Sequence, residues 1–369
     1  MTDASQDGHH MAHALRLAAR GLGNVWPNPA VGCVLVKDGS VVGRGWTQPG
    51  GRPHAEVVAL HQAGARAEGS TAYVTLEPCA HHGVTPPCAE ALIAAGVARA
   101  VTALTDPDPR VSGKGHAMLR QAGIAVTEGW LAPEATRLNA GFLKRMTQGL
   151  PFVTLKLAAT LDGRIATAAG ESRWITGPDA RRKVHALRMA HDAVMVGSGT
   201  ALADDPDLTV RDLGARHQPV RILLDRGLTH AADSRLGRTA GHSPVWLVHG
   251  PAAGTAARDG WTRTGATLIE VPEAGGHLDL AAALQALSAR GLTRILCEGG
   301  GTLGAALIRA GLIDDLALFT GAALIGADGH PALGPLHLAA LQAAPRPILV
   351  ETLSLGPDLY SLWQMPARG

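Results

Sequence analysis

The sequence predicts an α/β protein built from two domains. Apolar, strand-like runs alternate with segments of helical spacing, and such alternation is typical of sheets covered by helices. The chain has 369 residues, which is more than one domain usually contains. Gly149-Leu150-Pro151 interrupts the pattern before a new strand-like run begins. We therefore expect one domain over residues 1–148 and a second over residues 149–369.

Composition narrows the class of protein. Hydrophobic residues make up 46% of the chain, but no apolar run reaches the roughly 18 residues of a membrane span. The net charge of +2 provides no electrostatic argument for a nucleic-acid surface. Four cysteines cannot form a disulfide framework in a chain of this length, and no signal peptide is recognised. We therefore expect a cytoplasmic protein in a reducing compartment.

The first half reads as a layered α/β domain. A first helix is expected over 11–21, with His9, His10 and His13 near its exposed face. Runs at 31–36 and 40–45 flank the turn signal Lys37-Asp38-Gly39 and predict a hairpin. A helix at 54–63, a strand at 71–76, a helix at 88–95 and a strand at 99–104 follow, and 131–146 reads as one linking helix. Together they predict a three-layer α/β/α sandwich.

The second half has shorter strands, with helices between several of them. A helix is expected over 279–289. Cys33, in the first half, and Cys297 each lie in an apolar strand-like run, so we expect both to be buried core thiols. The predicted strands are 152–157, 192–196, 220–225, 245–248, 267–271, 294–297 and 316–319.

The strongest chemical signal is His54-Ala55-Glu56 followed by Cys79 and Cys88. One imidazole and two thiolates give three zinc ligands and leave the fourth position for water, as in catalytic zinc sites. Glu56 lies beside the metal without being a ligand, which suits a general acid/base. Zinc-dependent nucleobase deaminases share this pattern, usually with two residues between the cysteines. The alternatives are a structural half-site or two core thiols.

Eight residues separate Cys79 from Cys88 here. Gly83, Pro86 and Pro87 predict a loop that ends where a helix begins. Cys79 is then expected to close a strand and Cys88 to open the following helix, where the helix dipole favours a thiolate. His54 also falls at a helix start, so the ligands could face one pocket.

Two further segments suggest ligand binding. Asn28 is flanked by Pro27 and Pro29, and a stiffly held amide can donate and accept hydrogen bonds at a heterocycle edge; an ordinary turn asparagine is the alternative. The run EGGGTLG over 298–304 follows a strand and precedes a helix expected at 305–310. Glycines allow close approach of a ligand, and helix amides bind phosphate. The run lacks the Rossmann fingerprint, which weakens the case for a dinucleotide site. A simple strand-to-helix turn is the alternative.

These motifs resemble one known family. PNPAVG at 27–32, HAE at 54–56 and EPCAHHGVTPPC at 77–88 resemble the deaminase domain of the bifunctional riboflavin-biosynthesis deaminase/reductases, although Trp26 departs from the usual smaller residue. KLAATLDGR at 156–164, ESRWIT at 171–176 and GSGTALADDP at 197–206 resemble the reductase domain of that family. The resemblance implies a cytidine-deaminase-like sandwich followed by a dihydrofolate-reductase-like α/β domain, with Zn²⁺ and NADPH as cofactors and a homodimer or homotetramer as the assembly.

The resemblance also implies the chemistry. A zinc-activated water deaminates 2,5-diamino-6-(5-phosphoribosylamino)pyrimidin-4(3H)-one, and Glu56 carries the proton to the departing ammonia. NADPH then reduces the ribosyl group of 5-amino-6-(5-phosphoribosylamino)uracil to ribityl. The expected partner is thus a small phosphorylated pyrimidine, with no nucleic acid and no membrane.

Family roles can be assigned position by position. Arg188 and Arg211 suit the substrate phosphate, because a guanidinium can hold two phosphate oxygens. Arg226 stands where the family often has a small hydroxyl residue, so a contact with the cofactor's 2′-phosphate stays open. The matching cofactor positions are Ala158, Trp174, Thr200, Asp204, Gly300, Gly301, Thr302, Leu303 and Gly304, and the matching substrate positions are Ser172, Arg188, Leu208, Arg211 and Glu298. Two further substrate-binding candidates rest on their own chemistry: Asn28 through its amide and Lys156 as a cation.

Two other interpretations fit parts of the sequence. The first domain could be a zinc-binding scaffold, although a purely structural site has no need of Glu56. The chain could also be a nucleic-acid base deaminase fused to a reductase-like domain. That activity needs a basic groove lined with aromatic residues, and aromatic residues are only 3% of this nearly neutral chain.

Overall fold

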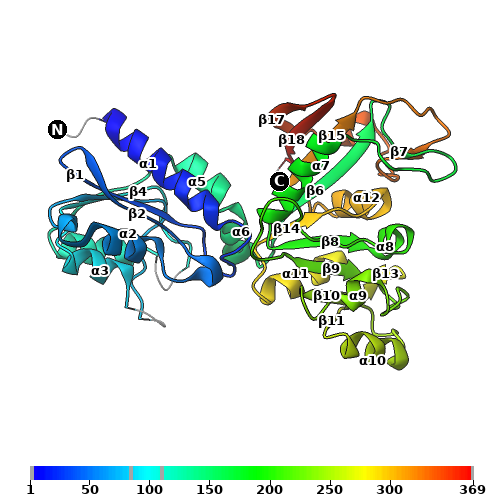
Figure 1. Ribbon diagram of the computed structural model, residues 1–369, viewed down its shortest axis with the longest axis horizontal. Coiled ribbons are helices and arrows are strands. Elements are labelled where there is room, and N and C mark those ends of the chain that lie inside the picture. Colours follow the sequence, from blue (N-terminus) through cyan, green and yellow to red (C-terminus); the bar gives the residue numbers. More distant parts are fainter. Residues whose placement is uncertain (1–3, 83–85, 109–111, 367–369) are drawn as a thin grey trace. The chain divides into compact units, whose positions relative to one another are not determined.

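The computed structural model describes residues 4–82, 86–108 and 112–366, and its chain forms two compact units, Met1–Leu150 and Pro151–Gly369 (Figure 1). Each unit has its own sheet and its own buried core. Gly83, part of the predicted loop between the two cysteines, lies outside the described residues. No helix among the described residues is long and apolar enough to cross a bilayer.

The first unit contains a five-stranded sheet in the order β2-β1-β3-β4-β5. The predicted hairpin is confirmed, because β1 and β2 pair antiparallel through a turn in which Asp38 and Gly39 have φ of 50° and 72°. Both central residues of a type I′ turn take such positive φ values. The strands β3, β4 and β5 run parallel to one another. The strand bounds are β1 Gly32–Lys37, β2 Ser40–Trp46, β3 Thr71–Val74, β4 Arg99–Thr102 and β5 Ala125–Thr127.

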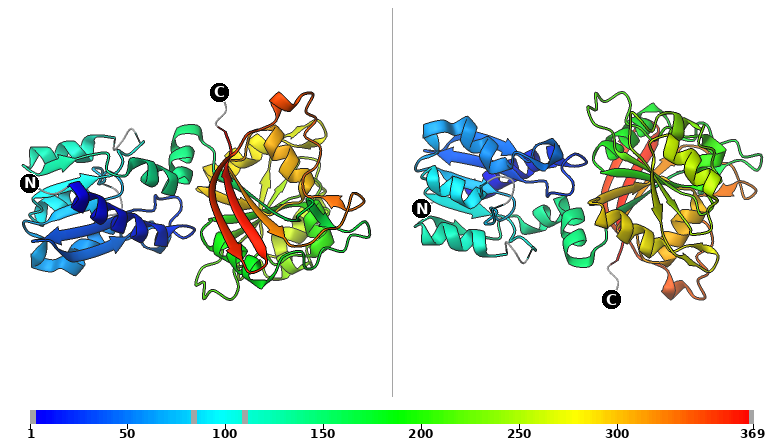
Figure 2. Two further views of the ribbon diagram at one scale, coloured as in Figure 1. Left: turned by 90° about the horizontal axis from the view of Figure 1, so that it is seen from above. Right: turned by 90° about the horizontal axis from the view of Figure 1, so that it is seen from below.

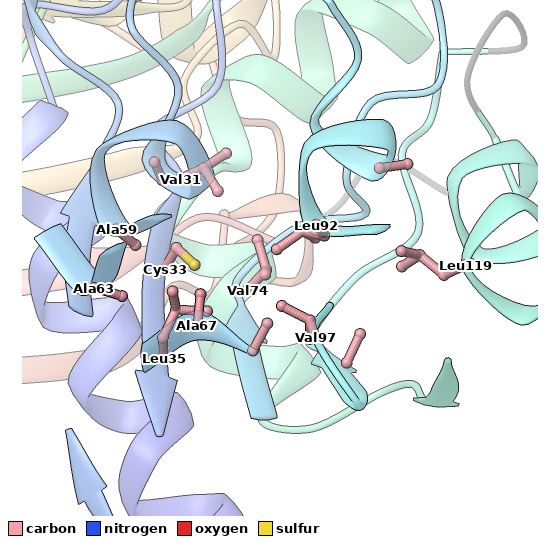
Figure 3. Packing of buried hydrophobic residues seen from close by; sticks show 14 of the residues in the cluster. Val31, Cys33, Leu35, Ala59, Ala63, Ala67, Val74, Leu92, Val97 and Leu119 are labelled. Atoms are coloured by element: carbon pink, nitrogen blue, oxygen red, sulfur yellow. The ribbon is translucent and has the colours of Figure 1, made fainter. Parts of the chain in front are cut away.

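Helices cover both faces of this sheet, so the predicted three-layer sandwich is confirmed. Cys33 and Leu35 of β1 pack on one face with Ala59 of α2 and Leu92 of α3 (Figure 3). Val34, whose side chain alternates to the opposite face, packs with the helices α1 and α5. The helix bounds are α1 Ala4–Ala18, α2 Ala55–Ala63, α3 Cys88–Ala94, α4 Lys114–Gln121, α5 Ala132–Leu138 and α6 Ala140–Gln148, with 3₁₀ turns η1 Ala19–Gly21, η2 Pro49–Gly51 and η3 Gly64–Ala67.

The strand β2 lies directly on the backbone of α2. A Cβ atom at Gly45 would be only 2.1 Å from the carbonyl oxygen of Ala55, which no real side chain allows. This close approach fixes the first turn of α2, where His54 is the N-cap residue and Glu56 lies in the first turn.

Two predictions for the first unit are wrong. The first helix begins at Ala4 instead of residue 11, and His10 is not on its exposed face, because its ring packs 5.1 Å from that of Tyr73. The linking segment is two helices instead of one. Asn139 separates them because its buried amide binds the backbone of Ala30, accepting from its N–H and donating to its carbonyl, each at 3.0 Å.

The second unit contains a nine-stranded sheet in the order β11-β10-β9-β8-β14-β6-β15-β18-β17. In this sheet order, the first seven strands, β11 through β15, run parallel. The strands β17 and β18 add an antiparallel hairpin at one edge, drawn in red in Figure 2. All seven predicted strands are present. The bounds are β6 Phe152–Thr160, β8 Ala193–Gly197, β9 Val220–Leu224, β10 Val245–His249, β11 Thr267–Glu270, β14 Arg294–Cys297, β15 Asp315–Gly321, β17 Ile348–Leu355 and β18 Asp358–Gln364.

Helices and short strands complete the second unit. The helix predicted at 305–310 begins four residues earlier, at Gly301, so the glycine run forms its first turn. Cys33 and Cys297 are both fully buried, as predicted. The remaining elements are α7 Pro178–Met189, α8 Ser198–Asp204, α9 Arg235–Arg238, α10 Thr255–Arg263, α11 Leu280–Ala289, α12 Gly301–Arg309, β7 Arg164–Ala166, β12 Glu273–Ala274, β13 His277–Leu278, β16 His330–Pro331 and η4 Leu341–Ala343.

His191 is a buried imidazole between α7 and β8. Its Nδ1 donates to the Leu187 carbonyl at 2.7 Å, and its Nε2 lies 2.9 Å from the hydroxyl of Thr154. Burial, with a smaller contribution from the charge of Arg294, lowers the pKa of His191 to about 4. The folded protein therefore holds this ring neutral.

This neutral ring predicts acid sensitivity. The unfolded chain takes up the proton near pH 6.5 and the folded chain only near pH 4, so stability is complete above pH 6.5 and falls as the pH drops through that window. The shift corresponds to about 3 kcal/mol of unfolding free energy. Urea unfolding at pH 7 and pH 4.5 measures it, and His191→Gln should lose less stability over this range than the wild type. An equal loss in both proteins contradicts the assignment.

Candidate active sites

The first unit brings together His54, Cys79 and Cys88 as predicted. Their ligand atoms all lie within 4.8 Å of one another. The Nδ1 atom of His54 is 3.3 Å from the sulfur of Cys88 and 3.7 Å from that of Cys79. Tetrahedral zinc with bonds of about 2.0 Å to nitrogen and 2.3 Å to sulfur separates two such ligands by about 3.5 Å. The donor set therefore fits Zn²⁺ in chemistry and in spacing.

The local structure explains why these residues meet. Cys88 is the first residue of α3, as expected, and its backbone N–H donates to the sulfur of Cys79 at 3.2 Å. Cys79 does not close a strand, because β3 already ends at Val74. A short loop after that strand carries it to the start of α3, where hydrogen bonds from Cys88, and then from His54, lower the pKa of the Cys79 thiol to about 4.

Glu56 lies next to this cluster and is only 4% exposed. Burial, reinforced by the charge of Cys79, raises the pKa of its carboxyl group. A carboxyl group in such surroundings can carry a proton, which a water-exposed glutamate does far less readily at neutral pH. The structure thus places the predicted acid/base beside the predicted metal ligands.

Asn28 lies against the loop that leads into His54. A Cβ atom at Gly51 would be 1.9 Å from the Nδ2 atom of Asn28, so the glycine makes room for this amide. The backbone N–H of Asn28 donates to the Val25 carbonyl at 3.0 Å. These contacts hold the amide, whereas its contact with a pyrimidine stays a prediction.

The second unit contains a cavity of about 890 Å³. It lies at the carboxyl ends of the parallel strands β6, β8, β9 and β14, which is where ligands bind in open α/β sheets. The predicted residues that line it are Lys156, Ala158, Ser172, Thr200, Asp204, Glu298, Gly300, Gly301, Thr302 and Leu303.

The glycine run forms one wall of this cavity. Gly300 is the N-cap of α12, and its N–H donates to the hydroxyl of Thr200 at 3.0 Å. Two cofactor positions predicted from distant parts of the sequence are therefore in contact. A Cβ at Gly301 would come within 3.0 Å of the Ala332 carbonyl, so glycine is needed for the packing of this helix as well.

The carboxylate of Glu298 lines the cavity and is paired with Arg188. Burial raises the pKa of Glu298, but the charge and hydrogen bonds of Arg188 outweigh it and leave that pKa below its ordinary value. The guanidinium of Arg188 grips both carboxylate oxygens, at 2.5 and 2.9 Å. Burial lowers the pKa of Lys156, and the negative charge of Glu298 partly offsets this effect. Because Arg188 is engaged by Glu298, its contact with a substrate phosphate stays a prediction.

Other predicted residues lie around the cavity instead of on its lining. Arg211 is half exposed, and the loop before it is fixed by Arg188, which donates to the Thr209 carbonyl at 2.8 Å. Leu208 in the same loop is buried at 3% exposure. Trp174 is 69% exposed. Gly304 faces Leu155 in the core.

Several residues that line the cavity carry no recognisable signal in the sequence. His277 comes from the two-residue strand β13 and His330 from β16, and neither strand has a readable period. Arg226 lines the cavity too, although its guanidinium also lies 3.3 Å from Glu273. In the first unit, the sequence marks Glu77 only as the first residue of the motif EPC at 77–79.

Comparison with known proteins agrees with both sites. The family model described as RibD C-terminal domain matches residues 151–360, and that of the cytidine and deoxycytidylate deaminase zinc-binding region matches residues 4–104. The riboflavin biosynthesis protein RibD of Escherichia coli is 46% identical over 366 residues, covering 96% of this chain and 98% of that protein.

Solved structures extend the likeness to the whole fold. Acinetobacter baumannii RibD is similar with a TM-score of 0.89 at 39% identity, covering 99% of this chain and 100% of that one. A diaminohydroxyphosphoribosylaminopyrimidine deaminase/5-amino-6-(5-phosphoribosylamino)uracil reductase from Thermotoga maritima gives a TM-score of 0.85 at 32% identity, covering 98% and 99%. With a zinc-ligand cluster in one unit, a cofactor-sized cavity in the other and full-length relatives, this chain belongs to the RibD family of bifunctional riboflavin-biosynthesis enzymes.

Proposed function

We propose that the chain catalyses two consecutive steps of riboflavin biosynthesis. The first is deamination of 2,5-diamino-6-(5-phosphoribosylamino)pyrimidin-4(3H)-one, assigned to residues 1–148. The second is NADPH-dependent reduction of the ribosyl group of 5-amino-6-(5-phosphoribosylamino)uracil, assigned to residues 149–369. The observation that carries the proposal is the buried Glu56 beside a three-ligand zinc site, on the same chain as a cavity walled by the glycine run.

The geometry of the first unit supports the deaminase roles that we propose. His54, Cys79 and Cys88 would hold zinc, which when bound supplies a Lewis acid that makes water nucleophilic at neutral pH. Glu56 takes a proton from the attacking water and donates it to the departing amino group. Asn28, held by its neighbours, reads the edge of the pyrimidine with its amide.

The lining of the cavity supports the reductase roles that we propose. NADPH supplies the hydride when bound. The N-terminus of α12, from Gly300 to Leu303, would hold the cofactor together with Thr200, Asp204 and Ala158, all of which line the cavity. Gly304 would support this turn from the core side, and the exposed Trp174 would lie beside the cofactor. Lys156, Ser172 and Glu298 line the cavity and would contact the ribosyl group. Arg188 bonds Glu298 and the Thr209 carbonyl next to the cavity, so Arg188, Leu208 and Arg211 would bind the phosphate there.

A paired assay tests this proposal. Zinc-loaded protein is given the diaminopyrimidine substrate while ammonia release and NADPH absorbance are followed together. We expect ammonia to be released even when NADPH is left out of the assay. When NADPH is present, its absorbance should fall only after deamination has begun. Ammonia without any use of NADPH contradicts the assignment of residues 149–369, and the absence of both signals contradicts the whole proposal.

We also propose that the chain forms a homo-oligomer through the strand β17. Apolar side chains stay in water along this edge strand, with Ile348 67%, Leu349 48% and Val350 47% exposed. An uncovered apolar edge strand is prone to pairing with another chain. A second copy of the chain can pair its own β17 antiparallel to this strand, which covers the exposed apolar side chains of both copies.

Sedimentation velocity tests the oligomer. The wild type should sediment as a dimer or larger assembly, and replacing Val350 with lysine should shift it towards the monomer, because a buried unpaired charge opposes association. A wild-type monomer at micromolar concentration contradicts the proposal. We further assign the chain to the cytoplasm, because zinc thiolates at Cys79 and Cys88 suit a reducing compartment, and cell fractionation tests this assignment.

A further inference from the structure

Glu77 is a buried carboxylate that the proposed mechanism does not use. It stands two residues before the ligand Cys79 and is only 3% exposed. Burying a carboxylate is costly unless hydrogen bonds replace its water. The partners of Glu77 therefore indicate what it does.

Four backbone N–H groups donate to this one side chain. Its Oε2 atom accepts from Asp106 at 3.1 Å and from Gly113 at 2.9 Å. Its Oε1 atom accepts from Gly115 at 2.8 Å and from His116 at 3.3 Å. A carboxylate can accept about four hydrogen bonds, so its capacity is filled.

These donors belong to the N-terminus of α4 and to the segment before it. The N-cap residue of α4, Gly113, has no side chain to cap the helix. Glu77 supplies that cap from a separate loop, and a negative charge there is favoured by the helix dipole. The two segments also touch, because a Cβ at Gly115 would lie 2.0 Å from the Pro78 carbonyl oxygen.

The helix α4 is itself fixed to the sheet. The Nε2 atom of His116 lies 3.0 Å from the hydroxyl of Thr102 on β4, and its Nδ1 lies 3.1 Å from Glu128. Glu77 thus connects the loop that carries Cys79 to an element with its own anchors. After Cys79 the chain enters the eight-residue spacer, so this anchor lies on the other side of the ligand, immediately before it.

We propose that Glu77 is a positioning residue that holds Cys79 in the geometry needed to bind zinc, acting through its four hydrogen bonds to the backbone of Asp106, Gly113, Gly115 and His116. This inference rests on the proposed zinc site. It assigns to Glu77 an effect on the metal in addition to its effect on the stability of α4.

Glu77→Gln tests the proposal in the full-length protein. Glutamine is nearly isosteric, but its NH₂ group cannot accept, so two N–H donors lose their partner and face another donor. Groups that orient metal ligands typically change metal affinity or activity by about 10–100-fold when mutated. We expect the dissociation constant for zinc to rise by that factor, the visible spectrum of the cobalt(II)-substituted protein to shift, and the kcat of ammonia release to fall, while reduction of supplied deaminated intermediate is unchanged.

Glu90→Gln is the matched control. Glu90 lies on α3 two residues after Cys88, has a side chain that is 42% exposed and pairs with His82 at the surface. This substitution removes the same charge near the same metal and leaves the hydrogen bonds of Glu77 in place, so the zinc affinity and cobalt spectrum of the variant should equal those of the wild type. An equal effect of both variants attributes the change to charge alone and overturns the proposal.

The outcomes separate this inference from the proposed function. If the wild type itself binds no zinc and releases no ammonia, the proposed function fails. If the wild type binds zinc and Glu77→Gln binds it equally well with an unchanged cobalt spectrum, only the positioning role fails, even if the melting temperature drops. Should Glu77→Gln not fold, Glu77→Asp keeps the charge with a shorter reach and should show the same loss at smaller size; failure of both to fold assigns Glu77 to folding and rejects the positioning role.

Discussion

Replacing Glu56 with glutamine is expected to lower the rate of ammonia release by about 10²–10⁴-fold, the range that a general acid/base contributes. The side chain keeps its size and its place at the start of α2, beside the metal ligands. The variant should therefore bind zinc as the wild type does. What it loses is the ability to take a proton from water and pass it to the amino group.

The measurement follows ammonia, zinc content and NADPH oxidation in one preparation. Reduction of supplied deaminated intermediate should be unaffected, because the cavity of the second unit is lined by residues of that unit. Glu134→Gln, an exposed glutamate in the first turn of α5, serves as the matched control and should release ammonia at the wild-type rate. Normal ammonia release by Glu56→Gln would show that another group carries the proton.

Replacing Arg188 with methionine is expected to destabilise the second unit by about 3–5 kcal/mol, the usual cost of removing one partner of a buried ion pair. The side chains of Arg188 and Glu298 are only 11% and 9% exposed. Methionine fills similar volume but leaves the carboxylate without its main partner. The pKa of Glu298 should then rise, because Arg188 no longer offsets the effect of burial.

Urea unfolding of the full-length chain measures this loss. Arg182→Met, an exposed arginine on the same helix, should change the midpoint little. The double variant with Glu298→Gln should recover much of the loss, because the unpaired charge is removed. If Arg188→Met alone loses less than about 1 kcal/mol, the pair is not the buried anchor that its geometry indicates.

The zinc site could be predicted because its residues carry the information themselves. Histidine and cysteine are metal ligands by their chemistry, and the fold brings His54, Cys79 and Cys88 together in one cluster. Glu56 lies beside it. Most strands of the two sheets were predicted for a similar reason, since runs of apolar residues mark buried strands, whereas β5, β17 and β18 were not predicted.

The features that escaped prediction depend on long-range contacts. Arg188 and Glu298 are 110 residues apart, and no local pattern shows that they bind each other before any substrate does. The strand β17 is exposed at the edge of the sheet and still carries apolar residues, so its sequence lacks the alternation that a half-buried strand shows. The four donors of Glu77 lie 29 to 39 residues further along the chain.

The bonds between Asn139 and Ala30 determine where this chain can be divided. The zinc-binding region that is shared with cytidine deaminases ends at residue 104, yet the segment leading into β1 is tied to a residue 109 positions later. A fragment cut after the shared region would leave the Ala30 amide and carbonyl without partners, two residues from Asn28. The deaminase module is therefore longer than its catalytic sheet, and the helices that lead to the reductase are part of it.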